Sequence, residues 1–219
     1  MKRTRHPLWQ EYAEQADRDL AVRLPAVVAT RQRDPNWRNY WPGHRSLQLI
    51  ELHEFCLQTM PKMILELGTG YTTFVMARYA VEFKAKLVSV EENMDWLQNH
   101  VAGMLPQWNT VSFWGSPVIT DNGTRRYETM PSDLPEIDLL YVDGPNCDYM
   151  GKSLTGSDAV KLVQSGVRPK HILFDMRHAS VDLFRSEVDG YCWEPGMSYE
   201  IARASYLRGT KHHSWFWRK

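Results

Sequence analysis

The sequence predicts an α/β protein with a Rossmann-like, doubly wound and mostly parallel sheet, helices on both faces and an antiparallel last strand. Short apolar runs alternate with helical patterns from residue 63 to residue 193, which is typical of parallel strands joined by right-handed crossovers. A turn with two glycines follows the first run, and three later runs end in Glu91, Asp143 and Asp175. Ligands of such sheets bind outside the carboxyl ends of the strands, so these positions mark the expected site.

The first apolar run, residues 63–67, has the composition of a strand that is buried on both faces of a parallel sheet. Gly68 and Gly70 let the backbone turn sharply there and approach a ligand closely. Thr72 or Thr73 then begins a helix, whose free N–H groups attract an anion. The third glycine of the dinucleotide fingerprint is missing, which counts against a nicotinamide cofactor.

The second run, residues 86–90, ends in Glu91 and Glu92. An acidic residue about 20 positions after the glycines suits the hydroxyl groups of a ribose. A solvated strand end is the alternative interpretation. The third strand, residues 111–114, is followed by a turn that contains Ser116.

The remaining elements follow from the same patterns. Helices are expected over residues 46–60, from about 93 to 104, over 159–163 and over 179–188, and strands over 137–142 and 171–174, with an antiparallel pair at 191–193 and 213–217. A hairpin or a loop is expected, centred on Asn122-Gly123.

The N-terminal part is expected to add helices and a lid. Residues 1–24 have a helical pattern that Pro25 interrupts. Residues 31–45 contain two prolines and three aromatic residues, so we expect an irregular segment that covers the site, or an anchored surface loop. The chain is therefore divided into residues 1–60, with helices and a lid-like segment, and a core of residues 61–219, within one compact domain.

The motif Glu-Leu-Gly-Thr-Gly-Tyr-Thr-Thr from Glu66, followed by Val-Glu-Glu-Asn from Val90, resembles the cofactor site of class I S-adenosylmethionine-dependent methyltransferases. Within that class it is most similar to the catechol O-methyltransferase-like branch, over about residues 45–190. The resemblance implies contacts with S-adenosylmethionine by Glu66, Gly68, Thr69, Gly70, Thr72, Glu91, Glu92, Ser116 and Asp143. In that set the residues from Glu66 to Thr72 surround the methionine part, Glu91 holds the ribose and Ser116 borders the adenine.

Asp143 and Asp175 end neighbouring strands and are expected to face one crevice. Two carboxylates can hold a divalent cation such as Mg²⁺, which lowers the pKa of an acceptor hydroxyl, and the matching positions of the resembling branch are metal ligands. The chain departs from that branch at Met176, where an oxygen ligand is usual, and at Asn146, where a lysine is usual. Carboxylates that only hydrogen-bond loops are the alternative.

His178 is the alternative catalytic base, and because Met176 and Asn146 leave the metal arrangement incomplete, we favour His178 assisted by Asp143, with any metal held loosely. Histidine titrates near neutral pH and accepts a proton from a hydroxyl. A histidine after a strand also serves as a helix cap or a surface residue, and that interpretation stays open.

The amino-acid composition of the chain restricts the class of protein. The 26 basic and 26 acidic residues balance, so nucleic acid is not an expected partner. Three widely spaced cysteines suit a reducing compartment and give no zinc spacing, and the chain has no apolar run of membrane length and no secretory signal. We therefore expect a cytoplasmic enzyme, with homo-oligomer formation as a further expectation.

The expected function is S-adenosylmethionine-dependent O-methylation of a small molecule or a sugar. A nucleic-acid methyltransferase is one alternative, because basic and aromatic residues alternate near both ends of the chain. A non-methylating nucleotide-binding protein of the same fold is the other, because a fold does not fix a function.

Overall fold

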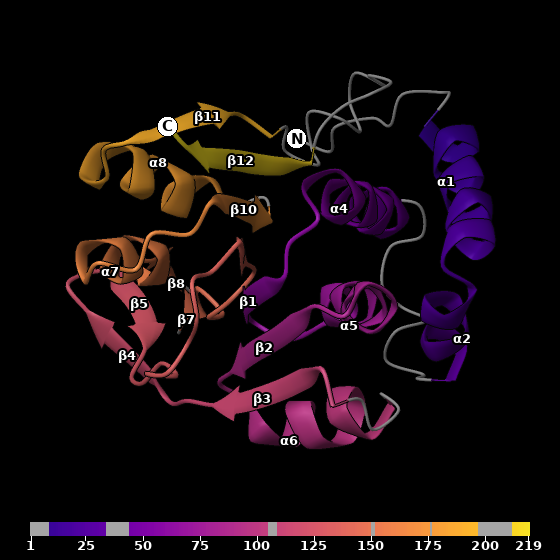
Figure 1. Cartoon of the computed structure of the whole chain (residues 1–219), viewed down its shortest axis with the longest axis horizontal. Helices are drawn as coiled ribbons and strands as arrows, with labels where there is room; N and C mark the ends of the chain where they lie inside the picture. The colour runs from indigo at the N-terminus through magenta and orange to yellow at the C-terminus, as the bar shows by residue number, and fades with distance from the viewer. Residues whose placement is uncertain (1–8, 34–43, 105–108, 150–151, 176, 197–211) are drawn as a thin grey trace.

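The structure is a computed structural model that describes residues 9–33, 44–104, 109–149, 152–175, 177–196 and 212–219 (Figure 1). Within these residues a seven-stranded sheet consists, in spatial order, of β11 (Tyr191–Glu194), β12 (His213–Arg218), β10 (His171–Asp175), β6 (Leu139–Val142), β1 (Met63–Leu67), β2 (Lys86–Glu91) and β3 (Val111–Gly115). The pairs from β10 to β3 are parallel, whereas β12 is antiparallel to both of its neighbours. The expected sheet, with its antiparallel last strand, is confirmed.

The helices form layers on the two faces of the sheet. They are α1 (Trp9–Arg23), α2 (Pro25–Arg33), α4 (His44–Thr59), α5 (Tyr71–Phe83), α6 (Met94–Trp96), α7 (Asp158–Gln164) and α8 (His178–Glu187). Figure 1 shows α4 and α5 on one face, with α1 and α2 outside them, and α7 and α8 on the other face. No helix in the described part of the chain combines the length and the apolar character that a membrane crossing requires.

Small sheets lie beside the main one. A three-stranded sheet contains β4 (Val118–Asp121), β5 (Thr124–Tyr127) and β9 (Thr155–Gly156), and β7 (Asp148–Tyr149) pairs with β8 (Lys152–Ser153). The β4–β5 hairpin turns at Asn122 and Gly123, both with positive φ, as the Asn-Gly pair predicts.

Strand residues alternate between two hydrophobic cores because successive side chains of a strand point to opposite faces. In β6, Leu139 and Tyr141 pack in the core under α4 and α5, whereas Leu140 and Val142 pack in the core under α7 and α8. In β10, Leu173 belongs to the first core and its two neighbours belong to the second. The alternation explains why both strands are apolar along their whole length.

The register of β6 and β10 places the two expected carboxylates together. Phe174 of β10 pairs with Val142 of β6, so the next residues, Asp175 and Asp143, lie side by side at the carboxyl ends. Both are an even number of positions from the residues of the first core, so their side chains point toward the α4 face of the sheet. This geometry brings the site within reach of α4.

Two expectations about the N-terminal part change. Pro25 begins α2, because its fixed φ suits the first position of a helix, and residues 31–33 are therefore helical rather than irregular. His44 and Arg45 belong to α4, which begins before the expected residue 46. The rest of the proposed lid, with Trp37, Tyr40 and Trp41, lies outside the described residues.

The predicted helix after β2 is present, but its form differs. Asn93 caps α6 by accepting a hydrogen bond from Trp96 N at 3.0 Å. The chain then continues as a π-helical turn, Leu97–Val101, and a 3₁₀ turn, Ala102–Met104. Trp96 is thereby held beside the glycine turn, where its Nε1 donates to Thr69 O at 3.1 Å.

A buried ion pair attaches α4 to the sheet. The Glu51 carboxylate accepts hydrogen bonds from the backbone N–H groups of His212 and His213 at 2.8 and 3.1 Å, and it lies 3.2 Å from His213 Nδ1. His213 Nε2 lies 3.1 Å from Tyr141 Oη in β6. Burial alone would lower the pKa of His213, but the hydrogen bond and charge of Glu51 raise it, and His213 in turn lowers the pKa of Glu51.

We predict that Glu51→Gln lowers the free energy of unfolding by about 2 kcal/mol near pH 6, because hydrogen bonds to a charged group are lost. The raised pKa of His213 means that its contribution is complete below its usual value of 6.5 and is lost as pH rises through the raised value. The lowered pKa of Glu51 means that its contribution is lost on acidification below 4.5. Denaturant unfolding at pH 6 and pH 9 measures the effect of His213, and a series of unfolding curves below pH 4.5 measures the effect of Glu51.

Glu54→Gln is the matched control, because Glu54 lies on the same helix in an exposed pair with Arg23 and is expected to change stability by less than about 0.5 kcal/mol. The Glu51→Gln loss should be smaller at pH 9, because the charge of His213 is lost as pH rises through its raised pKa. An equal loss at both pH values would contradict the charged pair.

Candidate functional site

The turn between β1 and α5 is fixed by a close backbone contact. Gly68 has a φ of +89°, and a Cβ there would lie 2.6 Å from Gly144 N. A Cβ on Gly144 would in turn lie 2.6 Å from Gly68 Cα. The carboxyl ends of β1 and β6 therefore touch through their backbones, which only glycine permits. Since the chain order of the sheet reverses between these two strands, this is the position where open α/β sheets bind ligands.

Glu66 lies beneath this turn and is fully buried. Its carboxylate accepts hydrogen bonds from the hydroxyls of Thr72, Thr73 and Ser89 at 2.7, 2.8 and 2.5 Å. Burial raises the pKa of Glu66 to about 8. The carboxyl group thus fastens the first turn of α5 to β2.

Glu91, at the end of β2, holds the same turn at Thr69, between the two glycines. One carboxylate oxygen accepts from Thr69 N and Thr69 Oγ1 at 2.8 and 2.7 Å. The other accepts from the N–H groups of Glu92 and Asn93 at 3.0 and 2.8 Å. Glu91 therefore fixes both the glycine turn and the start of α6.

A small cavity of about 90 Å³ opens beside the turn. It is lined by residues of α4, the glycine turn, the start of α5, α6 and the loop after β6: Arg45, Gln48, Leu49, Thr69, Gly70, Tyr71, Thr72, Trp96 and Asp143. Gly70 has an extended backbone that any residue adopts, and a Cβ there would meet no atom within 4 Å. The wall of the cavity at Gly70 is therefore open enough for a ligand to approach the backbone.

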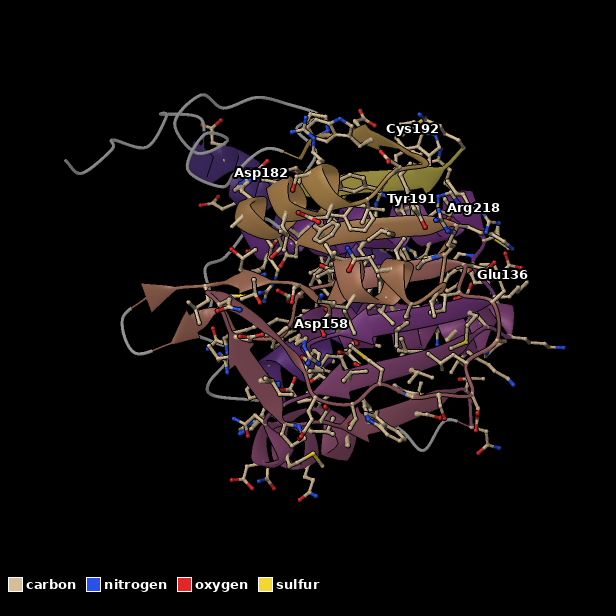
Figure 2. The ribbon with its side chains drawn as sticks, turned by 90° about the vertical axis from the view of Figure 1, so that its left-hand side faces the viewer. Glu136, Asp158, Asp182, Tyr191, Cys192 and Arg218 are labelled. Atoms are coloured by element: carbon tan, nitrogen blue, oxygen red, sulfur yellow. The ribbon has the colours of Figure 1, made fainter. Side chains whose placement is uncertain are left out.

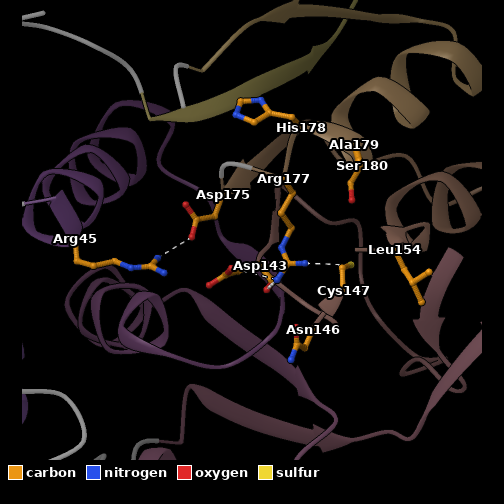
Figure 3. Close-up of a pocket in the computed structure, with 10 residues that line it drawn as sticks. All are labelled: Arg45, Asp143, Asn146, Cys147, Leu154, Asp175, Arg177, His178, Ala179 and Ser180. Atoms are coloured by element: carbon orange, nitrogen blue, oxygen red, sulfur yellow. Dashed lines mark hydrogen bonds and ion pairs between the residues drawn. The ribbon is translucent and has the colours of Figure 1, made fainter. Parts of the chain in front are cut away.

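A larger cavity of about 460 Å³ adjoins it (Figure 3). Its walls are Arg45, Asp143, Asn146, Cys147, Leu154, Asp175, Arg177, His178, Ala179 and Ser180. Arg45 and Asp143 line both cavities. These two side chains therefore stand where a ligand in one cavity would meet a ligand in the other.

Arg45 reaches from α4 to the carboxyl group of Asp175 (Figure 3). Its Nη1 donates to Asp175 Oδ2 at 3.0 Å, and Gln48 Nε2 donates to Asp175 Oδ1. Asp175 is only 5% exposed, so the ion pair compensates a buried charge. Burial alone would lower the pKa of Arg45, but the charges of Asp175 and Asp143 raise it above its usual range.

Asp143 is the carboxyl group that a ligand can reach. Its side chain is 29% exposed, compared with 4% for that of Asp175. Burial and the neighbouring charge of Asp175 raise the pKa of Asp143 to about 7, so it can take up and release a proton near neutral pH.

Arg177 holds the loop that follows Asp143. Its guanidinium donates to the carbonyl oxygens of Asp143 and Pro145, lies 3.4 Å from Asp143 Oδ1 and contacts Cys147 Sγ at 3.4 Å. Arg177 is thus engaged by the protein itself, where it holds this loop in place.

The residues present do not fit a divalent cation well. A hard cation takes about six oxygen ligands. Both oxygens of Asp175 already accept hydrogen bonds, from Arg45 and Gln48. Among the described residues no group of three or more His, Cys, Asp or Glu side chains is placed to hold a metal ion. Met176 lies outside the described residues.

The remaining predicted residues are distributed around the cavities. His178 is the first residue of α8, is exposed and lines the larger cavity, with its ring turned toward β12 and away from Asp143 in Figure 3. Ser116 is buried outside both cavities, where its N–H donates to Glu91 O at 2.9 Å. Glu92 is also outside both cavities, and its carboxylate accepts a long hydrogen bond from Asn146 N at 3.4 Å.

Sequence reasoning missed Arg45, Gln48 and Trp96. Arg45 and Gln48 lie one turn apart on α4 and share a 3.2 Å hydrogen bond. Their only sequence signal is a polar pair at helical spacing, which is common on any exposed helix. Their approach to Asp175 depends on how α4 packs on the sheet.

We predict that alanine destabilises the protein at one glycine of the turn and leaves its stability unchanged at the other. Gly68→Ala would place a Cβ against the backbone of Gly144 in a left-handed conformation, and should lower stability by more than about 2 kcal/mol. Gly70→Ala has both space and a permitted backbone conformation, and should unfold close to wild type. Thermal unfolding of the two variants checks this, and equal melting temperatures would argue against the backbone contact.

Comparison of the sequence with protein-family models found no match, and comparison with curated proteins found none either. Solved structures do match the fold. The O-methyltransferase TomG from Streptomyces achromogenes, in complex with S-adenosylmethionine, gives a TM-score of 0.61 at 12% identity, over 96% of this chain and 98% of that chain.

Two further structures agree. An O-methyltransferase from Bacillus cereus in complex with S-adenosylhomocysteine gives a TM-score of 0.58 at 12% identity, over 96% of this chain and 99% of that one. The S-adenosylhomocysteine-bound methyltransferase PaMTH1 from Podospora anserina gives 0.56 at 17% identity, over 99% of each chain. The glycine turn and the sheet order thus place this chain in the fold of the class I S-adenosylmethionine-dependent methyltransferases.

Proposed function

We propose that this chain is an S-adenosylmethionine-dependent methyltransferase that methylates an oxygen of a small molecule or a sugar. The observation that carries the proposal is the pair of adjoining cavities at the ends of β1 and β6, which share Arg45 and Asp143. One cavity adjoins the glycine turn, and the other has room for an acceptor. The shared fold of methyltransferases that bind S-adenosylmethionine or S-adenosylhomocysteine supports it.

The turn residues fit the cofactor. Open space at Gly70, beside the first N–H groups of α5, suits the carboxylate of its methionine part. Glu91 holds Thr69 in place through two hydrogen bonds. The family resemblance assigns to Glu91 the role of accepting hydrogen bonds from the ribose hydroxyls. Glu66 acts through the threonines that it fastens, as a positioning residue.

Asp143 is best placed to activate the acceptor. S-adenosylmethionine, held beside Thr69, Gly70 and Thr72, would supply an electrophilic methyl group for the acceptor oxygen. The Asp143 carboxylate lies at the junction of the cavities and accepts the hydroxyl proton. His178 lines the acceptor cavity and is proposed to orient the acceptor or to stand in as the base.

The first test is calorimetric binding of S-adenosylhomocysteine. Wild-type protein should bind one equivalent, and Glu91→Gln should bind more weakly by about 1.5–3 kcal/mol, because hydrogen bonds to a charged group are lost. Glu82→Gln, on the exposed side of α5, is the control and should bind as wild type does. No binding by the folded wild-type protein would overturn the proposed function and favour a protein that shares only the fold.

The second test separates the two candidate bases. With any acceptor that gives turnover in a screen of phenols and sugars, Asp143→Asn should lower kcat by 10²–10⁴-fold, the usual contribution of general base catalysis. His178→Ala should mainly raise KM for the acceptor. The reverse result, with kcat lost only in His178→Ala, would assign the base to His178.

A further inference from the structure

The carboxyl pair at the site has positive partners supplied by the chain. Asp143 and Asp175 lie side by side at the ends of β6 and β10, and a buried pair of like charges requires compensation. Arg45 pairs with Asp175 at 3.0 Å, and Arg177 lies 3.4 Å from Asp143. Two guanidinium groups thus face two carboxyl groups, and the local charge is already balanced.

Arg45 is held in this position by two side chains that are themselves hydrogen-bonded to each other. It pairs with Asp175, and it donates to the side-chain oxygen of Gln48 at 3.2 Å. Gln48 in turn donates to the second oxygen of Asp175. The three side chains therefore form a closed hydrogen-bonded group, so the guanidinium has one fixed place between the two cavities. A divalent cation at this place would lose the oxygens of Asp175 as ligands and would be repelled by Arg45 and Arg177.

We propose that Arg45 takes the place of a divalent cation at the Asp143–Asp175 pair, so that the site neutralises its carboxylates and polarises the acceptor oxygen without metal. A guanidinium presents several N–H donors in a rigid fork and stays charged at all physiological pH values. At the junction of the cavities it can donate to the acceptor oxygen while Asp143 accepts the proton. The inference rests on the proposed function for the identity of the transferred group, but the metal measurement below does not.

The test is a titration of chelator-treated protein with Mn²⁺. Binding is measured as the loss of the electron paramagnetic resonance signal of free Mn²⁺. At concentrations where Arg45→Ala binds one equivalent of Mn²⁺, wild-type protein should leave the signal unchanged. The affinity of Arg45→Ala for Mn²⁺ should be at least tenfold higher than that of wild type. The double variant Arg45→Ala/Asp175→Asn should lose this binding. Arg78→Ala removes an exposed arginine of α5 and should behave as wild type does.

Arg45→Gln, which keeps a polar, hydrogen-bonding side chain but removes the charge, serves if Arg45→Ala does not fold. Stoichiometric Mn²⁺ binding by wild type that is lost in Asp175→Asn would overturn the inference, and so would a folded Arg45→Ala that binds no Mn²⁺. Calorimetry with S-adenosylhomocysteine on the same samples tests the proposed function separately from the role of Arg45. If wild-type protein does not bind S-adenosylhomocysteine, the proposed function is overturned. If wild-type protein binds Mn²⁺, only the role of Arg45 is overturned.

Discussion

The backbone contact between Gly68 and Gly144 is the constraint on which the site depends. It brings the ends of β1 and β6 together at the point where the order of the sheet reverses. Glu66 fastens the turn from below through the threonine hydroxyls of α5, and Glu91 fastens it from above through Thr69. A larger residue at either glycine would separate the strands and, with them, the two cavities that share Asp143.

The second constraint is electrostatic. The alternation of side chains along β6 and β10 directs Asp143 and Asp175 to the face covered by α4, and α4 supplies Arg45 and Gln48. The buried pair of Glu51 and His213 holds the same helix on β12. The N-terminal part of the chain thus contributes to the site itself, and the position of α4 links the stability of the sheet edge to the arrangement of charges around the acceptor cavity.

The sequence allowed the sheet, the glycine turn and the acidic strand ends to be predicted, because these features depend on local patterns: apolar runs, glycines and the position of Glu91 or Asp143 after a strand. It did not reveal Arg45, because its partner Asp175 lies 130 positions away and the contact depends on helix packing. The structure also shows Glu66 beneath the turn, with its carboxylate occupied by three hydroxyls. That arrangement requires α5 and β2 to be in place, so a motif alone cannot report it.

The position of bound S-adenosylhomocysteine in a crystal structure is the most direct measurement. We expect its methionine part beside Thr69, Gly70 and Thr72, and its sulfur directed toward Asp143 and the larger cavity. No metal density is expected between Asp143 and Asp175 in crystals grown with Mn²⁺. Cofactor density at another edge of the sheet would contradict the proposed site, and a metal ion between the carboxyl groups with Arg45 displaced would contradict its proposed role.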